Sequence, residues 1–193
     1  MMRSRVMLAA ALLLWLPVAE CAPVSLGVIG GVARLAVSDP AGPTRPAEVP
    51  DLALAARIGW GRDTRFLLEV GRNTATLSAG PVDVGEHVER TAGRISYQER
   101  WRVSYGWKPW LGVGLGYVRE NDTLRHTVDS GGFLAAAFPD RSYASVDAVF
   151  SADSEWRWTH GWRVGIALRF EAPLDAHATT VVAAGALLTR RLR

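Results

Sequence analysis

The chain has four histidines, and two of them lie near residues that could assist nucleophilic chemistry. A histidine base beside a hydroxyl or a carboxylate can activate a nucleophile for acyl transfer. The candidate groups are His126 with Asp129 and Ser130, and His177 with Asp175. The alternative is that these histidines, like His87 and His160, are solvated in loops and turns. No spacing suggests a metal site and no glycine-rich phosphate loop occurs, so we expect no cofactor.

Charged side chains recur at every second position of several segments, which places them together on one face. In an enclosed space such charges must form a hydrogen-bonded ion network, because an unpaired buried charge is very costly. The alternative is that they line a narrow ion-conducting pore. The predicted network consists of Arg57, Arg65, Glu69, Arg94, Arg100, Arg102, Asp147, Asp153, Glu155, Arg157, Arg163, Arg169 and Glu171, with Gln98 among them.

The other face of the same segments is apolar, and a period of two predicts β-strands. The alternation is sharpest between Tyr143 and Trp158 and resumes directly after His160, so these segments form a tight hairpin. Two more hairpins, a glycine-rich first strand and an apolar last strand bring the predicted number to eight. We expect the strands near 25–37, 52–60, 66–70, 94–105, 111–117, 143–158, 162–171 and 178–192.

The predicted connections alternate in length, with short turns at 61–64, 106–109 and 159–161 and longer links at 38–50, 78–91, 120–142 and 172–177. Outer-membrane barrels have short periplasmic turns and longer external loops, whereas a soluble sandwich has no reason to sort its loops. A ten-residue strand tilted by about 40° also covers roughly 25 Å, the height of the apolar band of such barrels. The predicted fold class is all-β, an eight-stranded antiparallel transmembrane β-barrel with periplasmic termini.

Tryptophans concentrate near the predicted short turns. Indole rings prefer the headgroup zone of a bilayer and form belts at its interfaces. The alternative is a tryptophan core inside a soluble barrel. The predicted membrane-interface aromatic residues are Trp60, Phe66, Trp101, Tyr105, Trp107, Trp110, Trp156, Trp158 and Trp162.

The segment from Lys108 to Tyr117 reads KPWLGVGLGY. It resembles a strand of small outer-membrane barrels of the OmpA-like, OmpW-like and opacity types. The resemblance implies the barrel fold over residues 22–193 and is nearly silent about activity.

Some such barrels modify lipid A, and the deacylase type carries a histidine, serine and asparagine on its penultimate strand. The comparable positions here are Arg169 to Ala172.

Small outer-membrane barrels also commonly end in an aromatic residue, whereas this chain ends in Arg193. Either the last strand closes near Leu188 or the insertion machinery tolerates the basic tail.

The N-terminus has the features of a secretory signal. Arg3 and Arg5 precede an apolar run from Val6 to Leu16 that is too short to span a bilayer as a helix. We therefore expect a signal peptide over residues 1–21 and a barrel domain over residues 22–193. Cys21, the only cysteine, permits no intrachain disulfide. It would be acylated in a lipoprotein, but Glu20 occupies a position where lipid-attachment sites require a small residue.

Two ion pairs are predicted from the strand register. Pairing across the first turn places Trp60 opposite Phe66 and, on the other face, Arg57 opposite Glu69. Arg72 and Glu99 both lie on the apolar parity. They would be rough cross-strand neighbours, or else a bulge shifts the parity near Glu99.

The longest predicted loop, from Glu120 to Ser142, contains Phe133, Leu134 and Phe138. An exposed apolar cluster can mark a contact surface. The alternative is that the loop folds back over the barrel mouth.

The sequence favours an integral protein of the bacterial outer membrane, exported by a Sec-type route, with a structural or surface-interaction role. Expected partners are membrane lipids and lipopolysaccharide, the insertion machinery and an extracellular ligand reached through the loops. The net charge of +3 is no signature of nucleic-acid binding. Alternatives are an outer-leaflet lipid A-modifying enzyme of the deacylase or acyltransferase type, a narrow pore, or a soluble periplasmic barrel that binds an apolar ligand.

Overall fold

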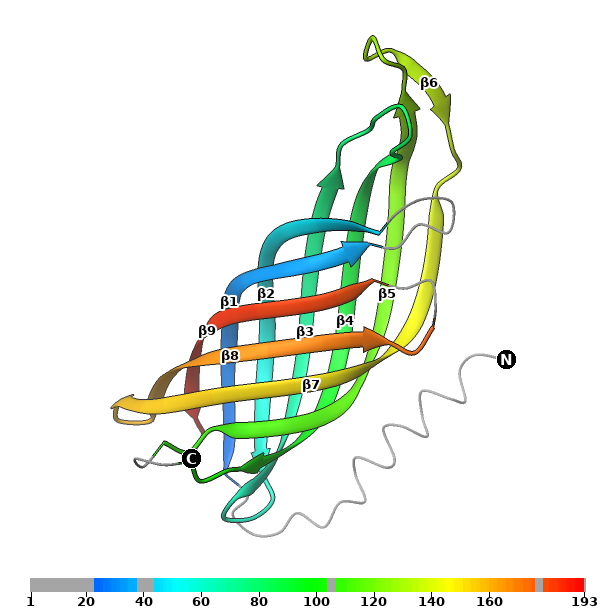
Figure 1. Cartoon of the computed structure of the whole chain (residues 1–193). Coiled ribbons are helices and arrows are strands. Elements are labelled where there is room, and N and C mark those ends of the chain that lie inside the picture. The colour runs from blue at the N-terminus through cyan, green and yellow to red at the C-terminus, as the bar shows by residue number, and fades with distance from the viewer. Residues whose placement is uncertain (1–22, 38–43, 104–106, 176–178, 193) are drawn as a thin grey trace.

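The strands of the described residues form a single antiparallel sheet (Figure 1). The computed structural model describes residues 23–37, 44–103, 107–175 and 179–192. The expected signal peptide, Tyr105 and His177 therefore lie outside the described residues. The strands are β1 Val24–Val37, β2 Arg45–Gly59, β3 Thr64–Leu77, β4 Gly85–Arg100, β5 Trp110–Val128, β6 Leu134–Ala137, β7 Arg141–Thr159, β8 Trp162–Pro173 and β9 Thr180–Arg191.

The sheet closes on itself because β4, the first strand in the spatial order, also pairs with β5. Eight strands form the barrel wall, whereas β6 pairs with β5 beyond the closed part. The predicted eight-stranded antiparallel barrel is confirmed. We call the end with the connections 60–63, 101–109 and 160–161 the turn end, and the opposite end the loop end.

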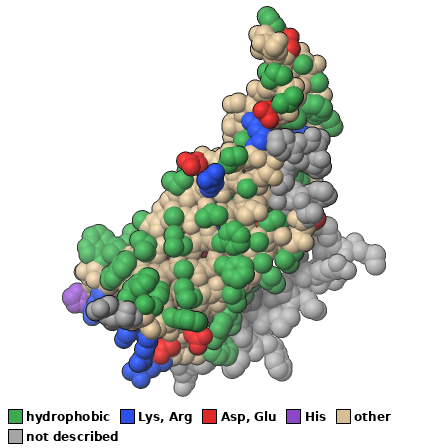
Figure 2. Space-filling view, viewed as in Figure 1, with side chains coloured by type: hydrophobic (Ala, Val, Ile, Leu, Met, Phe, Trp, Pro, Cys, Tyr) green, Lys and Arg blue, Asp and Glu red, His purple; other side chains and the backbone are tan. Residues whose placement is uncertain are grey.

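The two parities of each strand face opposite sides of the wall. On β7, Val146 and Phe150 are exposed outside, while Asp147 and Asp153 are buried in the lumen. Figure 2 shows apolar side chains across the visible face of the barrel, with Arg and Lys gathered at the turn end. The strand alternation therefore gives the barrel an apolar exterior and a polar interior, the reverse of a soluble barrel.

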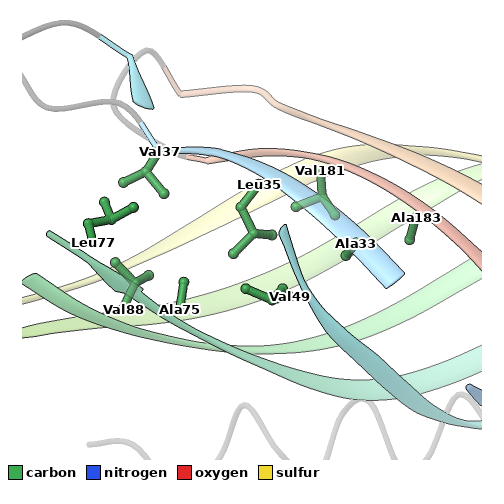
Figure 3. Close-up of a cluster of buried hydrophobic side chains, with 9 residues drawn as sticks. All are labelled: Ala33, Leu35, Val37, Val49, Ala75, Leu77, Val88, Val181 and Ala183. Carbon is green, nitrogen blue, oxygen red and sulfur yellow. The ribbon is translucent and has the colours of Figure 1, made fainter. Parts of the chain in front are cut away.

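Part of the lumen is nevertheless apolar, because β1 and β9 carry aliphatic side chains on both parities. One apolar cluster lies toward the loop end (Figure 3) and consists of Ala33, Leu35, Val37, Val49, Ala75, Leu77, Val88, Val181 and Ala183. A second cluster consists of Ile29, Ala53, Ala55, Leu67 and Leu187. Charged side chains pack beside these two clusters, so the lumen combines two kinds of packing.

The alternating glycines of β5 have a steric reason. A Cβ atom on Gly114 would lie 2.0 Å from the carbonyl oxygen of Ile95 and 2.6 Å from the Ser96 hydroxyl. A Cβ atom on Gly112 would lie 2.6 Å from the Gln98 side chain. Only glycine lets β4 and its lumenal side chains approach β5 this closely.

Several strand boundaries differ from the prediction. The ladder continues past the apolar band at the loop end, where β4 starts at Gly85, β5 ends at Val128 and β7 starts at Arg141. At the turn end β4 stops at Arg100, and β9 runs on to Arg191 rather than closing near Leu188. Strands can pair through their backbones without apolar side chains. The hydropathy pattern alone therefore does not locate the ends of these strands. No helix within the described part of the chain is long and apolar enough to cross a membrane.

Candidate functional site

A central ionic cluster spans the lumen, defined by Asp51, Glu69, Arg90, Arg94, Asp147, Arg169 and Glu171, all buried. Arg169 donates to Glu171 at 2.6 Å and lies 3.4 Å from Glu69. Arg90 donates to Asp147 and to Glu171, each at 2.6 Å. The Arg94 Nε atom lies 2.8 Å from Glu171. Arg90 and Arg169 thus each bridge carboxylates from different strands, and Arg94 adds a second strand-β4 contact to Glu171.

A turn-side cluster lies below it, defined by Arg57, Arg65, Gln98, Asp153, Glu155 and Arg163. Arg65 donates to Gln98 and Glu155, each at 2.7 Å, and pairs with Asp153. Glu155 also lies 3.1 Å from Arg57 and 3.3 Å from Arg163. Each carboxylate of this cluster is therefore shared by more than one arginine.

Little open space remains between these clusters. The cavity lined by Ile29, Asp51, Leu67 and Arg169 has a volume of about 10 Å³. A single water molecule needs about that much. Such packing opposes a continuous pore and matches an eight-stranded barrel whose interior is just wide enough for side chains.

Three predicted network residues lie at the turn end rather than in the packed lumen. Arg102 and Arg157 are exposed, and Arg102 follows the end of β4. Arg100 is half-buried, 4.9 Å from the centre of the Trp110 ring. Because β4 ends at Arg100, the alternation that suggested a lumenal Arg102 does not continue.

Trp110 is the exception among the predicted interface aromatic residues. It is only 7% exposed and its ring lies in the lumen, with the Arg65 guanidinium 4.0 Å from the ring centre. The prediction of a membrane-interface role for Trp110 is therefore wrong. Trp110 shares the lumenal parity of Gly112 and Gly114. These glycines leave room for large neighbouring side chains inside the barrel. Trp60, Trp101, Trp107, Trp156 and Trp158 are exposed, and Phe66 and Trp162 are half-buried.

Both register-based ion pairs are also wrong. Arg57 lies opposite Leu67, and Glu69 lies opposite Ala55. The hairpin is centred on Arg62 rather than on Asp63, which shifts the partner of each residue by two positions. Trp60 and Phe66 still touch edge to face, with ring centres 6.0 Å apart.

The outward-facing Arg72 binds Glu89 at 2.9 Å rather than Glu99, which lies opposite Thr64. The ladder between β3 and β4 is continuous at Glu99, so no bulge shifts its parity. Glu99 is exposed on the outer face.

Several further charged residues are buried that the sequence pattern did not indicate, notably Asp51, Arg90, Glu120 and Asp122. Arg90 and Glu120 fall in segments assigned to loops. The spacing of Arg90, Arg94 and Gln98 could have indicated that Arg90 is buried, because it extends the lumenal parity of β4 toward the loop end.

A loop-end cluster, defined by Glu86, Asp122, Arg125 and Arg141, ties β4, β5 and β7 together. Arg125 donates to Glu86 at 3.1 Å, and Arg141 lies 3.5 Å from Glu86 and pairs with Asp122. Burial, followed by the nearby Asp122 carboxylate, raises the pKa of Glu86.

The candidate nucleophile and base do not meet in the described residues. The His126 Nδ1 atom lies 2.7 Å from the carbonyl oxygen of Leu124. Asp129 instead accepts from the backbone N–H groups of Gly131 and Phe133. The second candidate pair includes His177, which lies outside the described residues.

A filled lumen, an apolar exterior and eight antiparallel strands define the class: this chain has the fold of the small outer-membrane β-barrels. No family model matches it, and no curated protein sequence does either.

Similar solved structures include Neisserial surface protein A, with 13% identity, a TM-score of 0.61 and coverage of 88% of this chain and 97% of that one. OprG of Pseudomonas aeruginosa has 9% identity, a TM-score of 0.57 and coverage of 89% and 97%. Ail, the attachment invasion locus protein of Yersinia pestis, has 9% identity, a TM-score of 0.55 and coverage of 89% and 97%. At these identities the likeness shows the fold alone.

Proposed function

We propose that this chain is an integral outer-membrane protein that makes surface contacts through a finger formed by β6 and the end of β5. The observation that carries the proposal is the exposed apolar strand of this finger. The apolar exterior of the barrel and its likeness to outer-membrane barrels support the location. The packed lumen supports a role other than transport.

The finger projects beyond the barrel wall instead of folding over the mouth (Figure 1). Gly132, with a φ of 82°, and the hydrogen bonds to Asp129 shape its tip. At its base, Arg125 lies over the Phe138 ring at 5.8 Å from the ring centre. These contacts hold β6 against β5 without covering its outer side.

The run from Phe133 to Phe138 carries no charge and reads FLAAAF. Phe133 is 74% exposed and Leu134 is 67% exposed. Within the described residues β6 ends the spatial strand order, so one of its edges has no strand partner. Proteins normally protect such an edge with charges or proline, because it is a template for pairing with another chain.

The occupant that fits this edge is an extended, uncharged segment of another protein, added as a further strand. Backbone hydrogen bonds along the edge would supply affinity. The small alanine side chains of β6 leave room, between Phe133 and Phe138, for larger side chains of the added strand. Two similar barrels are named as a surface protein and an attachment invasion locus protein, which fits a contact role.

Strand addition is tested by removing one outward N–H group. Phe138 donates its N–H to the Arg125 carbonyl oxygen, so by strand alternation the Ala137 N–H points away from β5. Ala137→Pro removes that donor, whereas Ala137→Val keeps it. The probe is a fluorescent, uncharged peptide of alternating valine and threonine, and the readout is anisotropy with the protein in detergent.

We expect saturable binding by the wild type and by Ala137→Val, and a loss of about tenfold in affinity for Ala137→Pro. Equal affinity of the two variants, or no binding to the wild type, contradicts strand addition. The location is tested separately, since release of the protein from membranes by carbonate without detergent contradicts an integral barrel.

A further inference from the structure

Two adjoining cavities open at the turn end and together form what we call the vestibule. The larger has a volume of about 380 Å³ and is lined by Arg100, Arg157, Arg163 and Arg191, among others. The smaller, of about 150 Å³, shares three of these arginines and adds Arg57 and others. These arginines come from five different strands, which the barrel closure brings to one place.

The vestibule has an excess of positive charge. Among the residues that the structure describes, Glu155 is the one carboxylate in its lining. That carboxylate already pairs with Arg57, Arg65 and Arg163. Among the described residues, no ion pair joins Arg100, Arg157 or Arg191 to a carboxylate. The central cluster has the opposite balance, with three arginines against four carboxylates, so this excess is a local property of the turn end.

Buried guanidinium groups in the vestibule also lack acceptors. Arg57 is 3% exposed, and none of its three nitrogen atoms has a hydrogen-bond partner, although Glu155 and Asp153 lie within ion-pair distance. The buried Nε atom of Arg100 likewise has no partner. Buried N–H donors without acceptors are costly, so a bound anion that accepts from them would remove a cost that the chain alone leaves.

We propose that the vestibule binds a phosphate-bearing anion. Guanidinium groups match phosphate oxygens with paired N–H donors, and several of them converge here on one cavity. A volume of about 380 Å³ holds a phosphate or diphosphate group with its water. Two sources offer this chemistry at the turn end: the headgroup of an anionic phospholipid of the adjoining leaflet, or a soluble phosphate compound.

The site is tested by calorimetric titration of inorganic pyrophosphate into the detergent-solubilised protein. The variants are Arg157→Gln and Arg191→Gln, which each remove one lining charge. Arg190→Gln is the matched control, because Arg190 is adjacent in sequence and equally basic but lies on the outer face beside Trp162. Circular dichroism and the heat-dependent gel shift verify that all variants are folded.

We expect saturable binding by the wild type, an affinity about tenfold lower in each vestibule variant and a change below about twofold in Arg190→Gln. Absence of saturable binding, or an equal loss in the control, overturns the proposal. A parallel titration uses nanodiscs of phosphatidylcholine with and without phosphatidylglycerol. Pyrophosphate binding that weakens when phosphatidylglycerol is present identifies the lipid headgroup as the occupant, whereas unchanged binding identifies a soluble anion.

Discussion

Arg169 and Asp51 are 118 positions apart in the chain, yet the Arg169 Nη2 atom donates to both carboxylate oxygens of Asp51 at 2.9 Å. The two residues come from β8 and β2, which do not pair with each other in the wall. Their contact crosses the lumen, and with the neighbouring ion pairs it ties together strands on opposite sides of the barrel.

Removing Arg169 should therefore destabilise the barrel strongly. Arg169→Ala leaves three buried carboxylates short of a partner, which predicts a loss of about 3 to 5 kcal/mol in the free energy of unfolding. Arg72→Ala is the control, because Arg72 is 62% exposed in its pair with Glu89 and should cost below about 1 kcal/mol. Urea unfolding in lipid vesicles measures both, and similar losses for the two variants would contradict the ranking.

The filled lumen predicts that the protein does not conduct ions. Purified protein in a planar bilayer should give no stable current steps, because the space between the clusters holds about one water. A double variant, Arg65→Ala with Arg169→Ala, removes a large side chain from each cluster and should conduct if it stays folded. Steady conductance of the wild type would show that the network opens in a membrane.

The close approach of β4 and β5 predicts that a side chain at Gly114 prevents folding. Gly114→Val places carbon atoms on the Ile95 carbonyl, and overpacking of this kind costs about 3 kcal/mol or more. Gly93→Val is a matched control on the outer face of β4, where nothing lies within 4 Å of an added Cβ. The heat-dependent gel shift reports folding, and a normal shift for Gly114→Val would refute the steric argument.

Trp110 and Trp156 should differ in their contact with lipid, since the first lies inside and the second is exposed outside. In variants that keep one tryptophan each, with the others changed to phenylalanine, brominated phospholipids should quench Trp156 strongly and Trp110 weakly. Equal quenching would mean that Trp110 faces the bilayer.

The raised pKa of Glu86 predicts a pH-dependent loss of stability at the loop end. The folded state holds this proton more tightly than the unfolded chain, so ionisation of Glu86 lowers the free energy of unfolding as pH rises from the ordinary value, about 4.3, through the raised one. Glu86→Gln removes this titration. Its stability relative to the wild type should therefore rise as the pH increases above the ordinary glutamate pKa in urea titrations. A relative stability that falls with pH would contradict the assigned direction.

The sequence by itself determined the barrel, because side-chain parity along a strand is a local property. Residues such as Phe150 and Asp147 must point to opposite faces whatever the strand pairs with. The strand number and the alternation of short turns with long loops then pointed to a closed wall with an apolar exterior. The sequence also indicated which charged residues share the lumenal parity, although not where each strand ends.

Only the tertiary structure decided which of those residues meet. Closure of a tilted sheet sets the height at which each strand faces the others, so Arg57 reaches Glu155 rather than Glu69. The same closure brings Trp110 beneath Arg65 and gathers the arginines of the vestibule. These contacts depend on the register and tilt of all strands around the barrel together. No local stretch of sequence determines them.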